Sequence, residues 1–230
     1  ITYYNDPYYI DHLTALGYEK DVDWIEHVIP LGDENCETYK RLKKISDSML
    51  RRTGYHKVDV TKRSDVKPYV RKAFDLVNVA YSHLYGTVEL NDRQIDKYVN
   101  KFLPLIDPDF CCLLVDDNKD LMGFAVGAPS MAEAMKKSRG RLFPLGWIGV
   151  LRSLRKNNAL DLFLIAVRPE LQGTGVNGIL MEHLYKGCIK HGIIYAETGP
   201  QLETNTKVHN QWKMFDTDQH KRRRCFKKTL

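Results

Sequence analysis

A chain of 230 residues with 43% hydrophobic residues is long enough for one large domain or two small ones. Its five cysteines are odd in number and lack zinc-ligand or disulfide-framework spacing, so we expect no metal and a reducing, cytoplasmic location. The formal net charge of +6 resides in residues 219–230, which hold six basic and no acidic residues, and this argues against nucleic-acid binding by the fold as a whole.

The first 31 residues predict a helix followed by a strand. Asn5-Asp6-Pro7 is a helix start signal, Gly17 is a stop signal, and residues 22–29 alternate as a strand does before Pro30. Because a helix and one strand cannot form a core, this segment must dock on another part of the fold.

Residues 34–126 predict three helices and three strands. Apolar residues at helical spacing, start signals and stops place the helices at 34–53, 65–84 and 92–105, and the strands at 55–60, 110–115 and 121–126. The last two strands are joined by a hairpin signal. Cys111 and Cys112 lie in an apolar run and are expected to pack in the core.

Residues 129–159 form a long connection between two strands, and long connections are usually functional or mobile. We expect a helix from Ser130 to about Ser138, within an insertion that flanks the site and helps form the acceptor pocket; a structural helical cap is the alternative. The longest uncharged apolar run, residues 142–151, contains Pro144 and falls well short of the roughly 20 residues of a membrane span. We therefore expect no transmembrane segment and no membrane partner.

The remaining residues predict a strand, a helix, a strand, a helix and a basic strand. They cover residues 160–167, 175–190, 193–198, 205–215 and 219–228. His183 lies on or near the apolar stripe of the first of these helices, which is typical of a packing histidine.

Residues 173–178 match the dinucleotide-binding pattern G-x-G-x-x-G, with Glu197 near the expected distance beyond it. Two features count against that interpretation. Five residues separate the strand from the first glycine, and the 33 residues after Glu197 are too few to complete a doubly wound sheet.

The intervening residues support a different interpretation. The segment Val167-x-Pro169-x-x-Gln172-Gly173-Thr174-Gly175-Val176 resembles motif A of the GNAT superfamily of acyl-CoA-dependent N-acyltransferases, with Asn177 in place of the last small residue. The order of elements over residues 55–230 is also similar. The resemblance implies an α+β fold (a three-layer α/β arrangement) with a mixed, mostly antiparallel sheet, helices on both faces, and a splay between strands 160–167 and 193–198.

The similarity extends to the domain organisation. Residues 1–31 resemble the closing helix and strand of a second GNAT-like unit, residues 32–54 would be a connecting helix, and residues 55–230 the acyl-CoA-binding domain with its insertion at 129–159. The whole is similar to the C-terminal part of bacterial tandem GNAT-like proteins of uncharacterised function. The resemblance therefore also implies a tandem partner unit or a homodimer.

The resemblance implies acetyl-CoA or another acyl-CoA as cofactor. Backbone amides of residues 173–177 would hold its diphosphate at a helix N-terminus, and the strand at 160–167 would pair with pantetheine and polarise the thioester carbonyl. The implied cofactor-binding residues are Ile165, Ala166, Val167, Gln172, Gly173, Thr174, Gly175, Val176, Asn177 and Asn205. Asn205 is also a good helix N-cap.

Direct transfer to an amine needs a base, because an amine is mostly protonated at neutral pH. Glu197 is the first candidate, with a salt-bridge or turn-capping role as the alternative; Asp161, Glu203 and His209 are weaker candidates. Trp212 stands where many GNAT enzymes have a tyrosine acid, and indole cannot act as an acid. Tyr195, another group or water would then protonate the thiolate.

Three hypotheses follow from the sequence. The first is an N-acyltransferase acting on a small-molecule amine or a peptide; the second is a non-catalytic acyl-CoA-binding or assembly module. The third is nucleic-acid contact through residues 222–228. The sequence does not identify the acceptor.

Overall fold

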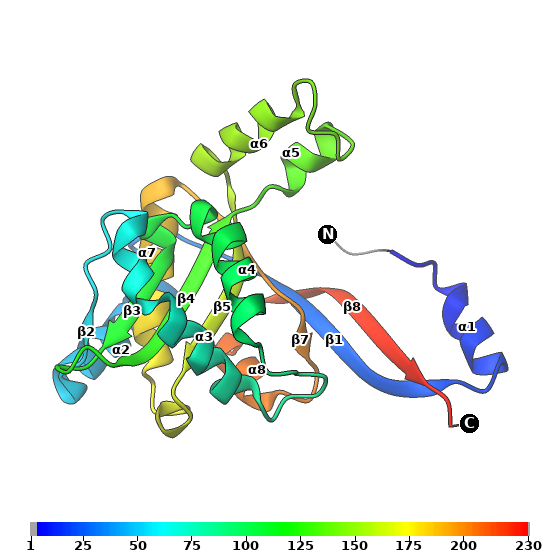
Figure 1. Cartoon of the computed structure of the whole chain (residues 1–230), viewed down its shortest axis with the longest axis horizontal. Coiled ribbons are helices and arrows are strands. Elements are labelled where there is room, and N and C mark those ends of the chain that lie inside the picture. Colours follow the sequence, from blue (N-terminus) through cyan, green and yellow to red (C-terminus); the bar gives the residue numbers. More distant parts are fainter. Residues whose placement is uncertain (1–3, 230) are drawn as a thin grey trace.

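The computed structural model describes residues 4–229, which form one eight-stranded sheet with helices on both faces (Figure 1). The helices are α1 (Tyr8–Ala15), α2 (Glu37–Thr53), α3 (Lys67–Tyr81), α4 (Asp92–Phe102), α5 (Ala132–Lys137), α6 (Gly146–Arg155), α7 (Asn177–His191) and α8 (Thr206–Trp212), with short 3-10 turns at Arg63–Val66, Leu103–Leu105, Pro108–Phe110 and Pro169–Leu171. The strands are β1 (Glu19–Pro30), β2 (His56–Lys57), β3 (Cys111–Val115), β4 (Leu121–Pro129), β5 (Ala159–Val167), β6 (Tyr195–Thr198), β7 (Gln201–Leu202) and β8 (Asp218–Lys227).

The sheet order is β2-β3-β4-β5-β6-β1-β7, and β8 also pairs with β1. All pairs are antiparallel except β5 with β6. Trp24 pairs with both Leu202 of β7 and Arg223 of β8, so β7 and β8 lie on opposite edges of β1. The N-terminal strand is therefore an interior strand of this sheet, which confirms that the segment docks on the rest of the fold.

Side-chain alternation along β3 divides the core into two layers. Cys112 and Leu114 pack with α2 and α7 on one face of the sheet. Cys111 and Leu113 pack with α3 on the other face. Burial raises the pKa of both cysteine thiols to about 12, which agrees with a packing role.

Most predicted elements are present, and a few differ from the prediction. The strand expected at 55–60 is reduced to His56–Lys57, because only these residues pair with β3. The helix expected from residue 65 begins as a 3-10 turn at Arg63, before Pro68 sets the first turn of α3. Two elements had no prediction of their own: the helix α6, within the insertion expected at 129–159, and the short strand β7.

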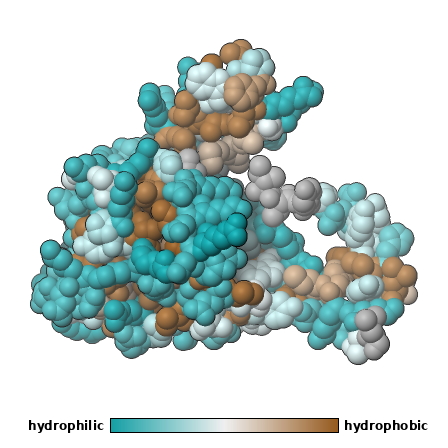
Figure 2. Space-filling model, viewed as in Figure 1, coloured by the Kyte–Doolittle hydropathy of each residue, from teal (hydrophilic) through white to brown (hydrophobic). Residues whose placement is uncertain are grey.

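Helices α5 and α6 project from the body of the molecule after β4 (Figure 1). The N-cap residue of α5 is Met131 rather than the expected Ser130, whose hydroxyl oxygen nevertheless accepts a hydrogen bond from the amide of Ala132. Phe143, between the two helices, is 83% exposed, and Figure 2 shows apolar side chains on this projection and at the far end of the β1–β8 ribbon. No described helix has the length and apolar character that a membrane crossing requires.

Gly187 in α7 is needed for close packing against the turn at Pro108–Phe110. A Cβ atom there would lie 2.3 Å from the carbonyl oxygen of Asp109 and 3.1 Å from ring atoms of Phe110. Glycine to alanine in a helix normally stabilises by roughly 1 kcal/mol. We expect Gly187→Ala instead to destabilise the fold by about 2 kcal/mol, since backbone must shift.

Urea denaturation checks this prediction, with Gly149→Ala in α6 as the matched control. A Cβ atom at Gly149 meets only the Cβ of Ala134 at 3.8 Å, so that variant should be neutral or slightly stabilising. Equal stability of the two variants would contradict the packing described here.

Candidate functional site

The glycine turn before α7 has the backbone conformation that the sequence predicted. Gly173 and Gly175 have φ angles of 78° and 97°, in the left-handed region that favours glycine. Thr174 donates its amide to the carbonyl of Leu171, whereas among the described residues none accepts a hydrogen bond from the amides of Gly173, Gly175 or Val176. Unpaired amides at the positive end of a helix are suited to bind an anion.

A cavity of about 110 Å³ lies between this turn, β5 and the start of α8. Seven of the predicted cofactor-binding residues line it: Ile165, Ala166, Val167, Gln172, Gly173, Asn177 and Asn205. The other three do not line it. Thr174 bonds its hydroxyl to the Leu171 carbonyl, Gly175 lies against Met49, and Val176 is fully buried.

Lys207 is a cavity residue that sequence reasoning missed. Its Nζ donates to Oε1 of Gln172 at 3.0 Å, which places a positive charge beside the turn. Asn205 caps α8 by accepting the amide of Val208 at 3.3 Å, so it fixes the turn of helix that carries Lys207. The sequence feature that could have identified Lys207 is its position two residues after the predicted cap Asn205.

Strands β5 and β6 pair over only four residues and then separate. Their register runs from Ala159↔Tyr195 to Leu162↔Thr198, and no pair follows among the described residues. On its other edge, β5 has an irregularity: Gly127 pairs with Leu162 and Val126 with Leu164, so Phe163 is the extra residue of a bulge. The bulge and the predicted splay coincide at Phe163.

A cleft of about 300 Å³ occupies this splay, and its lining is mainly apolar. Trp212 lies in the cleft wall, where it is 5% exposed and donates Nε1 to Oε1 of Gln201 at 2.8 Å. Tyr185 also lines the cleft, but its hydroxyl accepts the amide of Gly32 at 2.8 Å. Trp212 therefore has a structural role and supplies no acid to the cleft.

Tyr81 at the end of α3 lines both the cleft and the smaller cavity, and sequence reasoning did not identify it. Its hydroxyl donates to the carbonyl of Ile165 at 2.6 Å. Burial raises the pKa of Tyr81, so this hydroxyl stays protonated. The Ile165 carbonyl, one of the backbone groups expected to face pantetheine, thus already has a donor.

The candidate catalytic residues lie on the face of the sheet that carries α3 and α4. Leu160 and Ala196 pack with α7 on the opposite face, so alternation directs Asp161, Tyr195 and Glu197 away from them. Asp161 and Glu197 are register partners on β5 and β6. Two carboxylates therefore lie side by side, two residues before the bulge at Phe163.

The surroundings of the Asp161 carboxyl change its pKa. Burial raises its pKa, a hydrogen bond from Ser130 opposes the rise, and the negative charge of Glu197 adds to it. Burial also raises the pKa of Tyr195, and the negative charge of Glu197 adds to the rise. A carboxyl whose pKa is raised toward neutrality suits a general base, and sequence reasoning had ranked Asp161 below Glu197.

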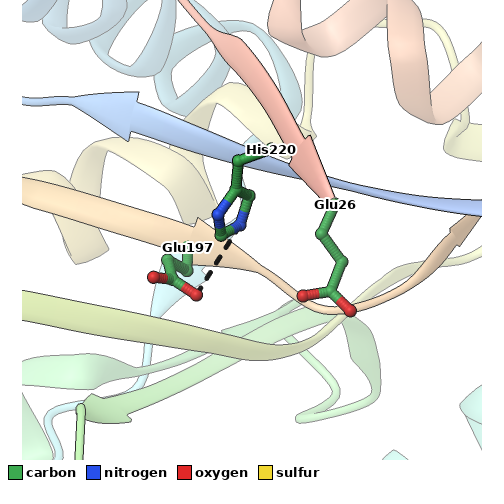
Figure 3. Close-up of side chains that lie close together, drawn as sticks. All are labelled: Glu26, Glu197 and His220. Carbon is green, nitrogen blue, oxygen red and sulfur yellow. Dashed lines mark ion pairs between the residues drawn. The ribbon is translucent and has the colours of Figure 1, made fainter. Parts of the chain in front are cut away.

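Glu197 lies beside Glu26 and His220, and Figure 3 shows these side chains converging from β6, β1 and β8. Oε2 of Glu197 is 3.7 Å from Nε2 of His220 and 2.9 Å from Nζ of Lys221. Lys221 is also 3.3 Å from Glu26. The three residues could coordinate a metal by their spacing, but Lys221 already pairs with both carboxylates and Arg223 pairs with Glu26.

The remaining acid–base candidates are engaged elsewhere. Glu203 pairs with Lys20 at 2.5 Å, which lowers the pKa of its carboxyl. A hydrogen bond joins Nε2 of His209 to the carbonyl oxygen of Leu202, and its ring packs against that of His27. Both residues stabilise the region around β7 and lie outside the carboxylate pair described above.

The basic strand β8 is neutralised along its length by β1. Asp23, fully buried, accepts hydrogen bonds from Arg222 and Arg224, and Arg223 pairs with Glu26. Lys227 lies 3.5 Å from Asp21. The positive charge of the C-terminal residues therefore stabilises the β1–β8 pair, which weighs against nucleic-acid contact through this strand.

Comparisons with known proteins agree with this geometry. The chain is 25% identical over 230 residues to Protein YghO of Escherichia coli (strain K12), covering 97% of this chain and 57% of that protein. It thus spans little more than half the length of this curated relative.

Two solved structures share the fold. A GCN5-related N-acetyltransferase from Sphaerobacter thermophilus superposes with a TM-score of 0.57 at 12% identity, over 96% of this chain and 56% of that one. A tandem GNAT protein from the clavulanic acid biosynthesis pathway superposes with a TM-score of 0.53 at 13% identity, over 96% of this chain and 58% of that one. The profile of the acetyltransferase (GNAT) family matches residues 72–212, a range that includes the glycine turn, the splay and the carboxylate pair. The chain belongs to the GNAT family of acetyltransferases.

Proposed function

We propose that the protein transfers an acyl group from acyl-CoA, with acetyl-CoA as the simplest donor, to an amine by direct attack. The observation that carries the proposal is the adjacency of two features. The cavity at the glycine turn, with its unpaired amides, shares the lining residues Tyr81, Ile165 and Asn205 with the cleft where β5 separates from β6. The first feature suits a diphosphate, and the second provides a cleft for an extended pantetheine arm.

The residues present fit this cofactor. The amides of Gly173 and Gly175, together with Lys207, would hold the diphosphate. The backbone near Ile165, Ala166 and Val167 would face the pantetheine arm, and an amide there would stabilise the oxyanion. When bound, acyl-CoA supplies the activated thioester carbonyl.

The carboxylates of Asp161 and Glu197, which precede the bulge at Phe163, would activate the acceptor amine. An amine arrives mostly as ammonium, and the negative charge of Asp161 attracts it. Asp161 would take the proton, directly or through water, because its pKa is raised toward that of a useful base. The negative charge of Glu197, which is held in place by Lys221, would keep the pKa of Asp161 raised.

The leaving thiolate also needs a proton. Tyr195 stays protonated because burial and neighbouring carboxylates raise its pKa, so Tyr195 or water would supply it. Trp212, paired with Gln201, would only shape the cleft.

The second candidate function is a non-catalytic acyl-CoA-binding module, and Trp212 is the observation that favours it. The two functions differ in turnover. Release of free CoA in the presence of an amine panel supports the enzyme, whereas tight binding without thiol release supports the module.

The proposal includes a second GNAT-like unit, either in tandem or as a homodimer. It also includes a small-molecule amine or a peptide as acceptor, and a cytoplasmic location. The relative lengths support the tandem arrangement, since this chain spans 57% of its curated relative. Helix α1 has no buried residue, which is consistent with a surface that another unit covers.

CoA binding tests the proposal. Titration calorimetry with acetyl-CoA should give saturable binding, and Lys207→Gln should weaken it about fivefold, corresponding to ~1 kcal/mol for an exposed charge pair. Lys213→Gln, an exposed lysine just after α8, is the matched control and should leave the affinity unchanged. Absence of binding at millimolar acetyl-CoA would refute the proposed function.

A further inference from the structure

A second, larger cavity lies on the face of the sheet that carries α3 and α4. Its volume is about 570 Å³, and none of the described residues that line it carries a charge. Aliphatic and aromatic side chains of α3, α4 and strands β3 to β5 form its wall, including Val77, Phe74 and Phe124. Its volume lies within the roughly 300–1,000 Å³ of pockets that hold drug-sized ligands, far more than an acetyl methyl group needs.

This cavity adjoins the cleft between β5 and β6. The two share the lining residues Val126, Leu162, Phe163, Leu164, Gly199 and Pro200. These residues lie at the bulge of β5 and just beyond the end of β6, where the strands separate. A chain attached to the reacting carbonyl in the cleft can therefore continue into the cavity.

Aromatic rings follow the route from α3 to the bulge. The ring of Phe74 lies 6.5 Å from that of Tyr98, Tyr98 lies 6.0 Å from Phe102, and Phe102 lies 6.4 Å from Phe163. Phe163 is 40% exposed although it is a large apolar residue on a sheet strand. The rings give a continuous apolar wall that ends at the point where the thioester would lie.

The cavity offers little to a polar ligand. The thiol of Cys111, on its floor, stays neutral because burial raises its pKa to about 12. The only other side-chain polar groups among the lining residues are the hydroxyls of Tyr69 and Tyr98. An apolar cavity without charged partners favours a hydrocarbon ligand over water or a polar acceptor.

We propose that this cavity binds a long hydrocarbon chain carried by one of the two substrates, either the acyl group of acyl-CoA or the tail of the amine. The inference rests on the proposed acyl-CoA function and adds a substrate class to it: at least one substrate is a lipid-like molecule. The carboxylates Asp161 and Glu197 on the same face then act on the polar end of that molecule.

Chain-length series on the full protein test this inference. In the first arm, calorimetry compares CoA, acetyl-CoA and octanoyl-CoA below micellar concentrations. Each fully buried methylene strengthens binding by roughly fourfold. If the acyl group supplies the chain, the Kd should therefore fall from acetyl- to octanoyl-CoA by at least about 30-fold, the gain from two to three of the six added methylenes. In the second arm, acetyl-CoA is the donor and the KM values of butylamine and octylamine are compared. If the amine supplies the hydrocarbon chain, the KM should be similarly lower for octylamine than for butylamine.

Either dependence supports the proposal and identifies the substrate that carries the chain. Independence of chain length in both arms, with CoA still bound, would overturn the cavity proposal alone. Failure of CoA itself to bind would overturn both this inference and the proposed function.

A cavity-filling variant ties the dependence to this site. Val77→Phe places a larger side chain in the cavity, so the ratio of Kd or KM between the short-chain and the long-chain ligand should fall by about tenfold or more. Val79→Phe, on the outer face of the same helix, is the control and should keep the ratio. Ala73→Leu, a smaller filling change, replaces Val77→Phe if thermal denaturation shows that the latter is unfolded. An unchanged ratio in a folded filling variant would contradict the assignment.

Discussion

Replacing Asp161 by asparagine is expected to lower kcat by about 10²–10⁴-fold, the usual contribution of a positioned general base. The amide cannot accept the proton of the attacking amine, whereas its size and hydrogen-bonding capacity resemble those of the carboxyl group. Affinity for acetyl-CoA should remain, because the amides of the glycine turn and Lys207 lie elsewhere. Thiol release with a productive amine, combined with calorimetry, measures both quantities.

The pH profile distinguishes a base from a structural residue. Because burial raises the pKa of Asp161, the acidic limb of kcat/KM should lie above the ordinary carboxyl pKa of about 3.9 and disappear in Asp161→Asn. Asp117→Asn in the exposed β3–β4 turn is the control and should change neither rate nor profile. If Glu197→Gln abolishes turnover while Asp161→Asn retains it, Glu197 is the base and the assignment made here is wrong.

Replacing Asp23 by asparagine is expected to lower the free energy of unfolding by about 3 kcal/mol, the loss typical of a broken buried ion pair. Its buried carboxylate accepts hydrogen bonds from Arg222 at 2.6 Å and from Nε of Arg224 at 2.8 Å, and Lys20 lies 3.5 Å away. The substitution leaves these cations without their shared partner. Urea denaturation measures the change, and Glu19→Gln, an exposed carboxylate on the same strand, should alter stability by less than about 0.5 kcal/mol.

The contribution of Asp23 also depends on pH. Hydrogen bonds and charge from Arg224 and Arg222 hold the pKa of Asp23 well below its usual range in the folded state, although burial opposes them. A depressed folded-state pKa stabilises the protein above the unfolded pKa of about 3.9, and this stability is lost as the pH falls below it. The stability difference between the protein and Asp23→Asn should therefore shrink between pH 5 and pH 2, and a constant difference would contradict the ion-pair account.

The glycine turn and most helices followed from local sequence because their determinants are local. Gly54 stops α2 with a φ of 71°, and Asn91 caps α4 by accepting the amide of Gln94. Gly173 and Gly175 adopt positive φ where the motif predicted a turn. Elements set by short-range signals are the ones that a single sequence predicts best.

The place of β1 could not be read from the sequence. Its pairing with β6, β7 and β8 joins residues at least 165 positions apart, and no local pattern encodes that register. The charges offered a hint in retrospect, since acids at Asp23 and Glu26 match the basic run of β8. The domain boundaries at residues 31 and 54 remain a prediction.

The candidate site was predicted only in part, because some of its residues come together only through tertiary packing. Motif spacing identified Gly173 and Asn177, whereas Lys207 and Tyr81 reach the cavity only through the packing of α8 and α3. The preference for Asp161 over Glu197 depends on burial, which follows from tertiary structure. The large apolar cavity under α3 and α4 has no sequence signature, because its residues look like ordinary core.

A crystal structure with CoA bound tests the central claim most directly. We expect the diphosphate against the amides of Gly173 and Gly175 and near Lys207, with the sulfur in the cleft beside Phe163 and within reach of Asp161. A CoA molecule bound elsewhere on the chain, or one whose sulfur lies away from the β5–β6 splay, would contradict it.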